Sequence, residues 1–309
     1  MNVPRHSLYF MLAVVCLLIG ATTFRLILKN KKPEKDHTEL RQRIQSWWIM
    51  IGLLFFFLLT GETLSIIFFG FLSFLALKEF LSIVPTRYAD RRVIFWAYLA
   101  IPIQYYWVSM HWYGMFIIFI PVYIFLLLPM RMVLTGETKG FIRSAGIIHW
   151  AVMLTVFSSS HIAYLLTLPV QNIDAGNLGL VLFLVFITEL NDVSQYIWGK
   201  SFGKHRIIPK ISPNKTWEGF IGGAVTVTCC ASFLAPVLTP LQMGHGFFAG
   251  LLLSGSGFIG DVVLSSVKRD LHIKDSGTLI PGHGGILDRM DSLFYTAPLF
   301  FHFTYYLYY

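Results

Sequence analysis

Charged side chains are scarce in this sequence of 309 residues. Asp, Glu, Lys and Arg make up only 13% of it, against roughly a quarter in an ordinary soluble domain. Hydrophobic residues make up 55%, and the mean hydropathy is +0.64. This composition excludes a typical soluble protein and leaves no stretch for a separate soluble domain. We therefore interpret residues 1–309 as a single transmembrane domain.

Cysteine is nearly absent as well. Cys16, Cys229 and Cys230 all lie inside apolar runs, where they fit as small packing residues, so a thiolate metal site is not indicated. The sequence also has no separate domain and no platform of aromatic and basic residues that could bind nucleic acid, so nucleic acid is excluded as a partner.

Long apolar runs are abundant, and a helix of about 20 apolar residues crosses a bilayer core. They predict an all-α, polytopic integral membrane protein with about nine to ten transmembrane helices. The first run is too long for a signal peptide and is kept as a helix. Residues 47–84 fit either two helices or one bent element. The candidate segments are 8–28, 47–61, 64–84, 93–109, 113–130, 147–168, 177–198, 219–239, 246–264 and 292–309.

Cations are distributed unevenly between the predicted loops. Nearly all of the 24 Lys and Arg residues follow the first, third, fifth, seventh or ninth helix, and Arg5 is left alone on the other side. By the positive-inside rule, the N-terminus lies outside and these loops are cytoplasmic. The expected location is the cell inner (plasma) membrane. The charge on this face, part of a formal +8, can attract anionic headgroups or a polyanionic substrate.

The two most polar stretches, 188–218 and 260–291, both open to the predicted cytoplasmic side, so residues 188–291 are expected to hold the catalytic motifs. Each stretch begins inside an apolar helix, which places Glu189, Asp192 and Asp261 near the membrane boundary. An ionisable residue there is costly unless it faces a cavity, a partner or an ion. These carboxylates are therefore functional candidates.

The second stretch has the spacing of a phosphate and metal site. Helical periodicity puts Ser265, Lys268 and Arg269 on one stripe with Asp261. A break at 281–285 frees backbone N–H groups that could line an anion pocket. Asp288 and Asp291 then follow three residues apart, on one face of a helix with Arg289 turned away. Oxygen ligands of this kind suit Mg²⁺ or Mn²⁺.

The first stretch is broken by glycine and proline and carries a short cluster of cations that ends at Lys215. Such a cluster beside carboxylates resembles a clamp for phosphates. Ser212 and Thr216 add hydroxyl donors. His283, in the second stretch, fits a proton-transfer or phosphate-contacting role and a structural role equally well.

At these residues the sequence resembles the CDP-diacylglycerol synthase, or phosphatidate cytidylyltransferase, family. An upstream family pattern is present at Asn191, Asp192, Tyr196, Gly199, Gly203, Ser212, Pro213, Lys215, Thr216, Glu218 and Gly219. The family signature is met without a gap at Ser265, Lys268, Arg269, Lys274, Asp275, Gly277, Pro281, His283, Gly284, Gly285, Asp288, Arg289 and Asp291. The resemblance covers the C-terminal ~40% of the chain, and the N-terminal helices match only in being hydrophobic.

The resemblance implies a Mg²⁺-dependent reaction, with one or more cations, in which a phosphatidate-like lipid phosphate attacks CTP and pyrophosphate leaves. It implies metal ligands at Asp261 and Asp288, with Asp192 and Asp291 next. Asp261, Asp288, Asp291, Lys268 and His283 form the implied catalytic set. Substrate contacts are implied for Lys215, Ser212, Thr216, Ser265, Arg269, Lys274, Gly284, Gly285 and Arg289. A cavity between the last helices is expected to admit the lipid sideways from the membrane.

Two positions depart from the family pattern: Leu264 stands where many members have glutamate, and Gln195 where they have a small residue. Both could mark a different lipid acceptor. The alternatives are a CTP-dependent lipid kinase, a secondary transporter that uses the membrane carboxylates, and a silent scaffold. Transport would favour polar groups spread through the midplane and an internal repeat, which the sequence does not show. The oligomeric state stays open, with a homodimer as one option.

Overall fold

The computed structural model describes residues 3–31, 34, 37–279, 282 and 284–309. Its helices in the first half are α1 (Arg5–Lys31), α2 (Thr38–Thr60), α3 (Glu62–Ile83), η1 (Tyr88–Asp90), α4 (Arg91–Ser109), α5 (Tyr113–Ile118), η2 (Phe119–Ile124) and α6 (Phe125–Val133). The remaining elements are α7 (Phe141–Val152), η3 (Met153–Ser158), α8 (Ser159–Tyr164), η4 (Leu165–Thr167), α9 (Gly176–Phe202), β1 (Arg206–Ile208), β2 (Ser212–Thr216), α10 (Trp217–Leu238), α11 (Met243–Asp270), α12 (Leu287–Met290) and α13 (Leu293–Tyr308).

The helical membrane fold is confirmed. Within the described residues, eight continuous helical segments are long and apolar enough to cross a membrane. Helices α4 and α13 occupy the other two candidate segments, so the predicted nine to ten is an approximate count. Two of the eight segments, 113–133 and 141–167, contain a π-helical turn, and the first of these turns includes Pro121, which lacks the N–H that a regular helix uses.

Residues 47–84 form two helices rather than one bent element. Gly61 separates α2 from α3 with φ 120° and ψ 171°, a conformation open to glycine and strained for other residues. Helix α2 begins at Thr38, earlier than the expected residue 47. The charged segment that follows Thr38 contains one Leu, two Arg and two Gln, which favour helix, so apolar length alone placed the start too late.

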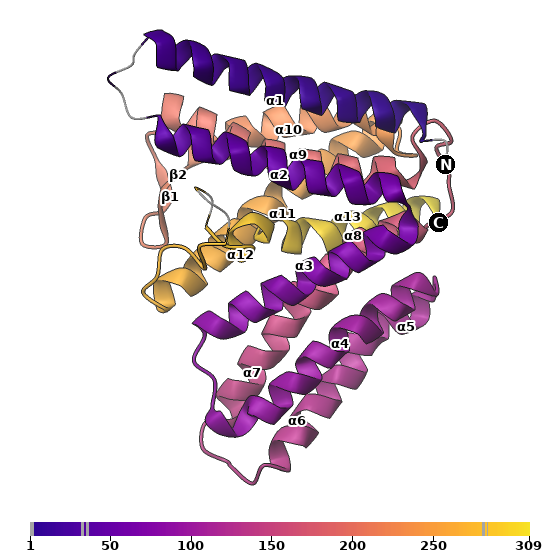
Figure 1. Cartoon of the computed structure of the whole chain (residues 1–309), viewed down its shortest axis with the longest axis vertical. Coiled ribbons are helices and arrows are strands. Elements are labelled where there is room, and N and C mark those ends of the chain that lie inside the picture. Colours follow the sequence, from indigo (N-terminus) through magenta and orange to yellow (C-terminus); the bar gives the residue numbers. More distant parts are fainter. Residues whose placement is uncertain (1–2, 32–33, 35–36, 280–281, 283) are drawn as a thin grey trace.

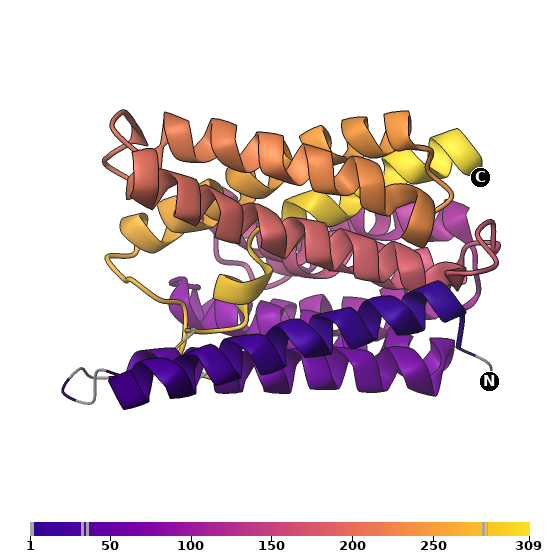
Figure 2. The ribbon, with the colours of Figure 1, turned by 90° about the horizontal axis from the view of Figure 1, so that it is seen from above.

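The helices run between two ends of a bundle (Figures 1 and 2). The N- and C-termini lie at one end, and the β1–β2 hairpin, the start of α2 and the end of α11 lie at the opposite end. The loops that carry most cations therefore share one end with both motif stretches. This arrangement agrees with the predicted grouping of the loops.

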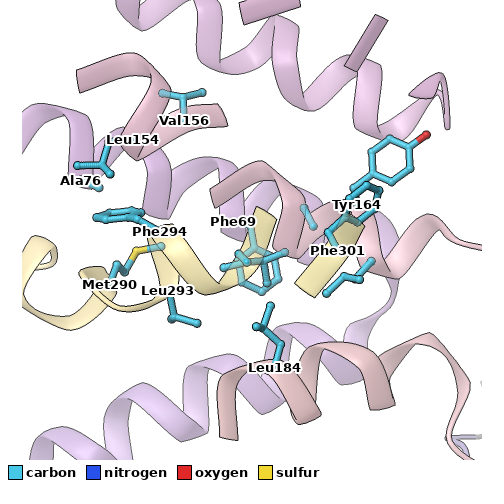
Figure 3. Close-up of a cluster of buried hydrophobic side chains, with 14 of the residues drawn as sticks. Phe69, Ala76, Leu154, Val156, Tyr164, Leu184, Met290, Leu293, Phe294 and Phe301 are labelled. Atoms are coloured by element: carbon cyan, nitrogen blue, oxygen red, sulfur yellow. The ribbon is translucent and has the colours of Figure 1, made fainter. Parts of the chain in front are cut away.

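Helix α13 lies at the centre of the packing. It contacts α8, α9 and α11, and Phe294, Phe300 and Phe301 on it are almost completely buried. Figure 3 shows Phe294 and Phe301 among Phe69 of α3 and Leu184 of α9. The core thus joins the N-terminal α3 to the C-terminal helices that carry the motifs.

Small residues bring α9, α10, α11 and α13 into close contact. A side chain at Gly250 of α11 would come within 2.7 Å of the Thr228 Cα on α10, and one at Gly260 within 2.5 Å of the Asp291 carbonyl oxygen. Such close approach is typical of helix packing in membranes. At Gly260 it places the middle of α11 directly against the turn that leads into α13.

Candidate active site

Asp288 is held in a cluster of donors between α11 and α12. Its Oδ1 accepts a hydrogen bond from Lys268 Nζ at 2.8 Å. Its Oδ2 accepts from the Ser276 N–H at 2.9 Å and from the Gly285 N–H at 3.0 Å, and the Ser276 hydroxyl oxygen lies 2.9 Å from it. Burial alone raises the pKa of Asp288, but these donors lower it more, so its pKa lies below its ordinary value. Asp288 is therefore an anion that fixes Lys268.

A glutamate outside both motif stretches contacts the same segment. Glu79 of α3 accepts hydrogen bonds from the Ile286 N–H at 2.9 Å, from the Leu287 N–H at 3.1 Å and from the Ser276 hydroxyl. The sequence analysis missed Glu79 because it looked for chemistry only in the polar stretches. An ionisable residue near the end of an apolar helix was the available signal.

The glycines at this turn are explained by these two carboxylates. Gly284 has φ +79°, and a side chain there would also overlap the Asp288 carboxylate. A side chain at Gly285 would overlap the Glu79 carboxylate. The N–H groups at 281–285 were expected to line an anion pocket, but the Gly285 N–H donates to the protein's own Asp288, and the Ile286 and Leu287 N–H groups that follow donate to Glu79.

Lys215 organises a second cluster. It lies on β2, and its Nζ forms an ion pair with Asp261 Oδ2 of α11 at 2.7 Å and donates to Gln195 Oε1 of α9 at 3.3 Å. Burial lowers the pKa of Lys215, but the charges of Asp261 and Asp192 raise it more, so Lys215 keeps its proton. A permanent cation thus stands among the acidic side chains at the junction of three elements.

Two more carboxylates face this cation. Asp192 and Asp291 are close enough to Asp261 and to each other to interact electrostatically. The Ser292 hydroxyl donates to Asp192 Oδ2 at 2.9 Å, whereas the buried Asp192 Oδ1 has no hydrogen-bond partner. An unpartnered buried carboxylate oxygen fits a cation or a bound proton donor.

The acidic cluster does not form a complete metal cage. No group of three His, Cys, Asp or Glu side chains with metal-binding geometry occurs among the described residues. Mg²⁺, however, usually needs only one or two carboxylates and takes its other ligands from water and substrate phosphates. One or two of Asp192, Asp261 and Asp291 therefore fit such an ion, whereas both oxygens of Asp288 already accept hydrogen bonds from protein donors.

Comparison with known proteins supports the family that the sequence motifs indicated. The model of the cytidylyltransferase family matches residues 41–307. The chain belongs to this family. It is 44% identical to the uncharacterized protein YnbB of Escherichia coli K12, over 94% of this chain and 95% of that protein.

Two phosphatidate cytidylyltransferases match over a shorter length. The Bacillus subtilis protein is 38% identical over 43% of this chain and 50% of its own length. The Staphylococcus saprophyticus protein is 42% identical over 38% of this chain and 46% of its own length. The matched segment covers about half of the length of each of these relatives, and the predicted family resemblance is confirmed.

The basic stretch of this cytidylyltransferase forms a hairpin that the sequence analysis did not predict. Strands β1 and β2 are antiparallel, with Arg206 opposite Thr216. Ser212 begins β2, and the Thr216 hydroxyl caps α10 by accepting from the Gly219 N–H at 3.1 Å. Thr216 therefore has a structural partner, and the hairpin carries Lys215 toward α11.

The other predicted residues are dispersed around the two clusters. The Ser265 hydroxyl donates to Asp261 Oδ1 at 3.2 Å, and the Arg269 side chain donates to the Ile211 carbonyl oxygen at 3.2 Å. Lys274 is exposed. His283 lies outside the described residues.

Gln195 and Leu264, the two departures from the family pattern, have clear roles here. Gln195 Nε2 donates to Asn191 Oδ1 at 3.0 Å, and the Ser254 hydroxyl donates to the same oxygen at 2.9 Å. Together with its contact to Lys215, this makes Gln195 a link between the acidic cluster and α11. Leu264 is buried in the core.

An apolar pocket of about 380 Å³ lies beside these clusters. It was expected between the last helices, but α2 and α3 form most of its wall, and residues of α8, α9, the segment after α11, and α12–α13 form the rest. Glu189 and Arg289 are its ionisable lining residues. Arg289 Nε is buried without a hydrogen-bond partner. Arg289 thus lines the pocket together with Glu189, and its charge interacts with those of Glu189 and Asp192. The full lining is Ser46, Trp47, Ile49, Met50, Ile51, Leu53, Leu54, Phe68, Phe69, Phe71, Leu72, Leu75, Ile162, Val185, Glu189, Leu279, Ile286, Arg289, Met290 and Leu293.

Proposed function

We propose that this cytidylyltransferase transfers CMP from CTP to the phosphate of a lipid, phosphatidate or a close relative, in phospholipid biosynthesis. A phosphate oxygen of the lipid attacks the α-phosphorus of CTP, the bond from that phosphorus to the β-phosphate oxygen breaks, and pyrophosphate leaves. The products are CDP-diacylglycerol, or the corresponding CDP-lipid, and pyrophosphate. The names of the two relatives that match over a shorter length, both phosphatidate cytidylyltransferases, support this acceptor.

The observation that carries the proposal is the position of an acidic and basic centre next to an apolar pocket. Lys215 and Lys268 are two cations fixed by carboxylates, at 2.7 Å and 2.8 Å. Fixed cations bind phosphate oxygens without first having to be ordered, which favours the transition state. The pocket beside them matches acyl chains, and Arg289 lies where the pocket meets the polar centre.

The acidic residues then have divided roles. One or two of Asp192, Asp261 and Asp291 would hold Mg²⁺, and a bound Mg²⁺ ion would neutralise charge on the triphosphate and orient it. Asp288 orients Lys268 instead of serving as a primary metal ligand, because its oxygens already accept hydrogen bonds from Lys268 and from the Ser276 and Gly285 N–H groups. Ser265, which donates to Asp261, supports that carboxylate.

The orientation in the membrane is part of the same proposal. CTP is a soluble polyanion, so it reaches the end of the bundle that carries the hairpin and most cations. That end is assigned to the cytoplasm, with the N-terminus outside and the protein in the inner (plasma) membrane. The lipid comes from the bilayer, between α2 and α3.

Pyrophosphate release tests the proposal directly. The purified full chain is given CTP and phosphatidate, with and without Mg²⁺, and the lipid product is identified by mass. Asp261→Asn is expected to lose activity, because it removes the partner of Lys215, while Asp270→Asn, at the exposed end of the same helix, keeps it.

Other products would contradict the proposal in different ways. CDP with a newly phosphorylated lipid would identify a CTP-dependent kinase. A folded protein without product from any of a panel of phospholipid acids would refute the transfer reaction and favour the transporter alternative, in which Glu189, Asp192 and Asp261 serve as an ion path.

A further inference from the structure

Glu79 connects the N-terminal half of the chain to the signature segment. It lies on α3, whereas its three hydrogen-bond donors, Ser276, Ile286 and Leu287, lie about 200 positions later in the sequence. A carboxylate can stabilise two backbone N–H groups that would otherwise lack partners at a bend in the chain. The bend is therefore fixed from outside, by a different part of the protein.

The same segment has contacts on both of its sides. On one side, Asp288 accepts from Ser276 and from Gly285 and holds Lys268. On the other side, Leu279 and Ile286 line the apolar pocket. A displacement of this bend would move the support of Lys268 and the wall of the pocket together.

We infer that Glu79 is a positioning residue for the transfer reaction: by holding Ser276, Ile286 and Leu287 against α3, it keeps Asp288 in place to orient Lys268. This inference rests on the proposed function for its kinetic consequence. Glu79 touches neither substrate in this assignment, so it acts through the backbone of Ile286 and Leu287 and through the Ser276 hydroxyl.

The contact between Glu79 and the bend leaves no room for a side chain at Gly285. A methyl group there would overlap the Glu79 carboxylate, and each of the nearest atoms that it would meet belongs to Glu79. The absence of a side chain at Gly285 is thus required by Glu79 itself. This reciprocity makes the inference testable by paired substitution.

The first measurement is hydrogen exchange on the full chain in detergent, which needs no enzymatic activity. In wild type, the Ile286 and Leu287 amides are expected to exchange slowly. In Glu79→Ala their exchange becomes at least ~10-fold faster, the factor that corresponds to losing about 1.4 kcal/mol of protection. Glu62→Gln, at the other end of the same helix and paired with the exposed His111, is the matched control and leaves both amides unchanged.

The second measurement separates positioning from simple folding. Glu79→Gln preserves the shape, but its NH₂ group must face at least one N–H donor, so it keeps only part of the hydrogen bonding. The turnover number is expected to fall by ~10-fold or more in Glu79→Ala and less in Glu79→Gln. KM for CTP is expected to stay within ~3-fold, because the cations themselves remain.

The third measurement is a double-mutant cycle. Gly285→Ala is expected to impair turnover strongly in wild type and much less in the Glu79→Ala background, where the overlapping carboxylate is gone. Equal effects in both backgrounds, or wild-type exchange and turnover in both Glu79 variants, would overturn the inference. An inactive wild type would refute the proposed function alone, because the exchange experiment would still decide the role of Glu79.

Discussion

Removal of the Lys215 charge is expected to destabilise the protein and to make its stability depend on Mg²⁺. Lys215→Met preserves much of the side-chain volume and removes the cation that stands among Asp192, Asp261 and Asp291. The three carboxylates then repel one another without compensation. A divalent cation can take over the role of the lost ammonium group.

The magnitude follows from the burial of the ion pair. Removing one partner of a fully buried pair costs about 3–5 kcal/mol, and an exposed pair is worth about 0–1 kcal/mol. Lys215 and Asp261 are 19% and 24% exposed, so the lower end of the buried range, about 3 kcal/mol, applies. For a chain of this size, that corresponds to a fall in the melting temperature of about 5 °C or more.

The assay is thermal unfolding of the detergent-solubilised full chain at increasing Mg²⁺, without substrates. Lys210→Met, an exposed lysine of the same hairpin, is the control and should melt like wild type. Mg²⁺ should raise the melting temperature of Lys215→Met more than that of the control. A Lys215→Met variant that melts like wild type would refute the assigned electrostatics, and a destabilised variant without any Mg²⁺ response would refute the metal assignment.

Three further predictions follow from the same structure. The pKa of Asp288 is lower in the folded than in the unfolded state, so its contribution to stability is complete above about pH 4 and is lost as the pH falls through the folded-state pKa. The free energies of unfolding of wild type and Asp288→Asn, measured by chemical denaturation, should therefore differ near pH 7 and converge in acid. Arg289→Leu should raise KM for the lipid acceptor more than KM for CTP, measured in mixed micelles, because Arg289 lies in the apolar pocket. A cysteine that replaces Lys210 in a cysteine-free variant should be labelled by a membrane-impermeant reagent in inverted but not in right-side-out vesicles, and the opposite pattern would reverse the assigned orientation.

The helices were predictable because their apolar length is a local property of the sequence. Their ends were less so, since α9 continues to Phe202 and α11 to Asp270 through polar residues that remain helical. The hairpin at 206–216 escaped prediction because its strands are only three and five residues long and contain proline and lysine. A short pair of strands of this kind is stabilised by its surroundings more than by its own composition.

Within the site, contacts along one helix were predictable and contacts between elements were not. The spacing of Asp261 and Ser265 placed both on one stripe of the helix, and in the structure their side chains form a hydrogen bond on α11. Asp288 and Asp291 were expected on one helical face, but α12 ends at Met290. As a result, Asp288 accepts hydrogen bonds from Lys268 and Ser276, whereas Asp291 belongs to the acidic cluster around Lys215. Such partners come from packing, which no spacing rule encodes.

The division of the site between the two halves of the chain bears on acceptor choice. The family motifs at 191–291 supply Lys215, Lys268 and the carboxylates, which suit the triphosphate that all CTP-dependent transfers share. The apolar pocket is walled mostly by α2 and α3, which lie outside both motif stretches, although the family model matches the chain from residue 41 onward. Selection on the lipid acceptor can therefore change α2 and α3 while the phosphate chemistry stays fixed. Glu79 limits that freedom, because α3 must still hold the segment that carries Gly285 and Asp288.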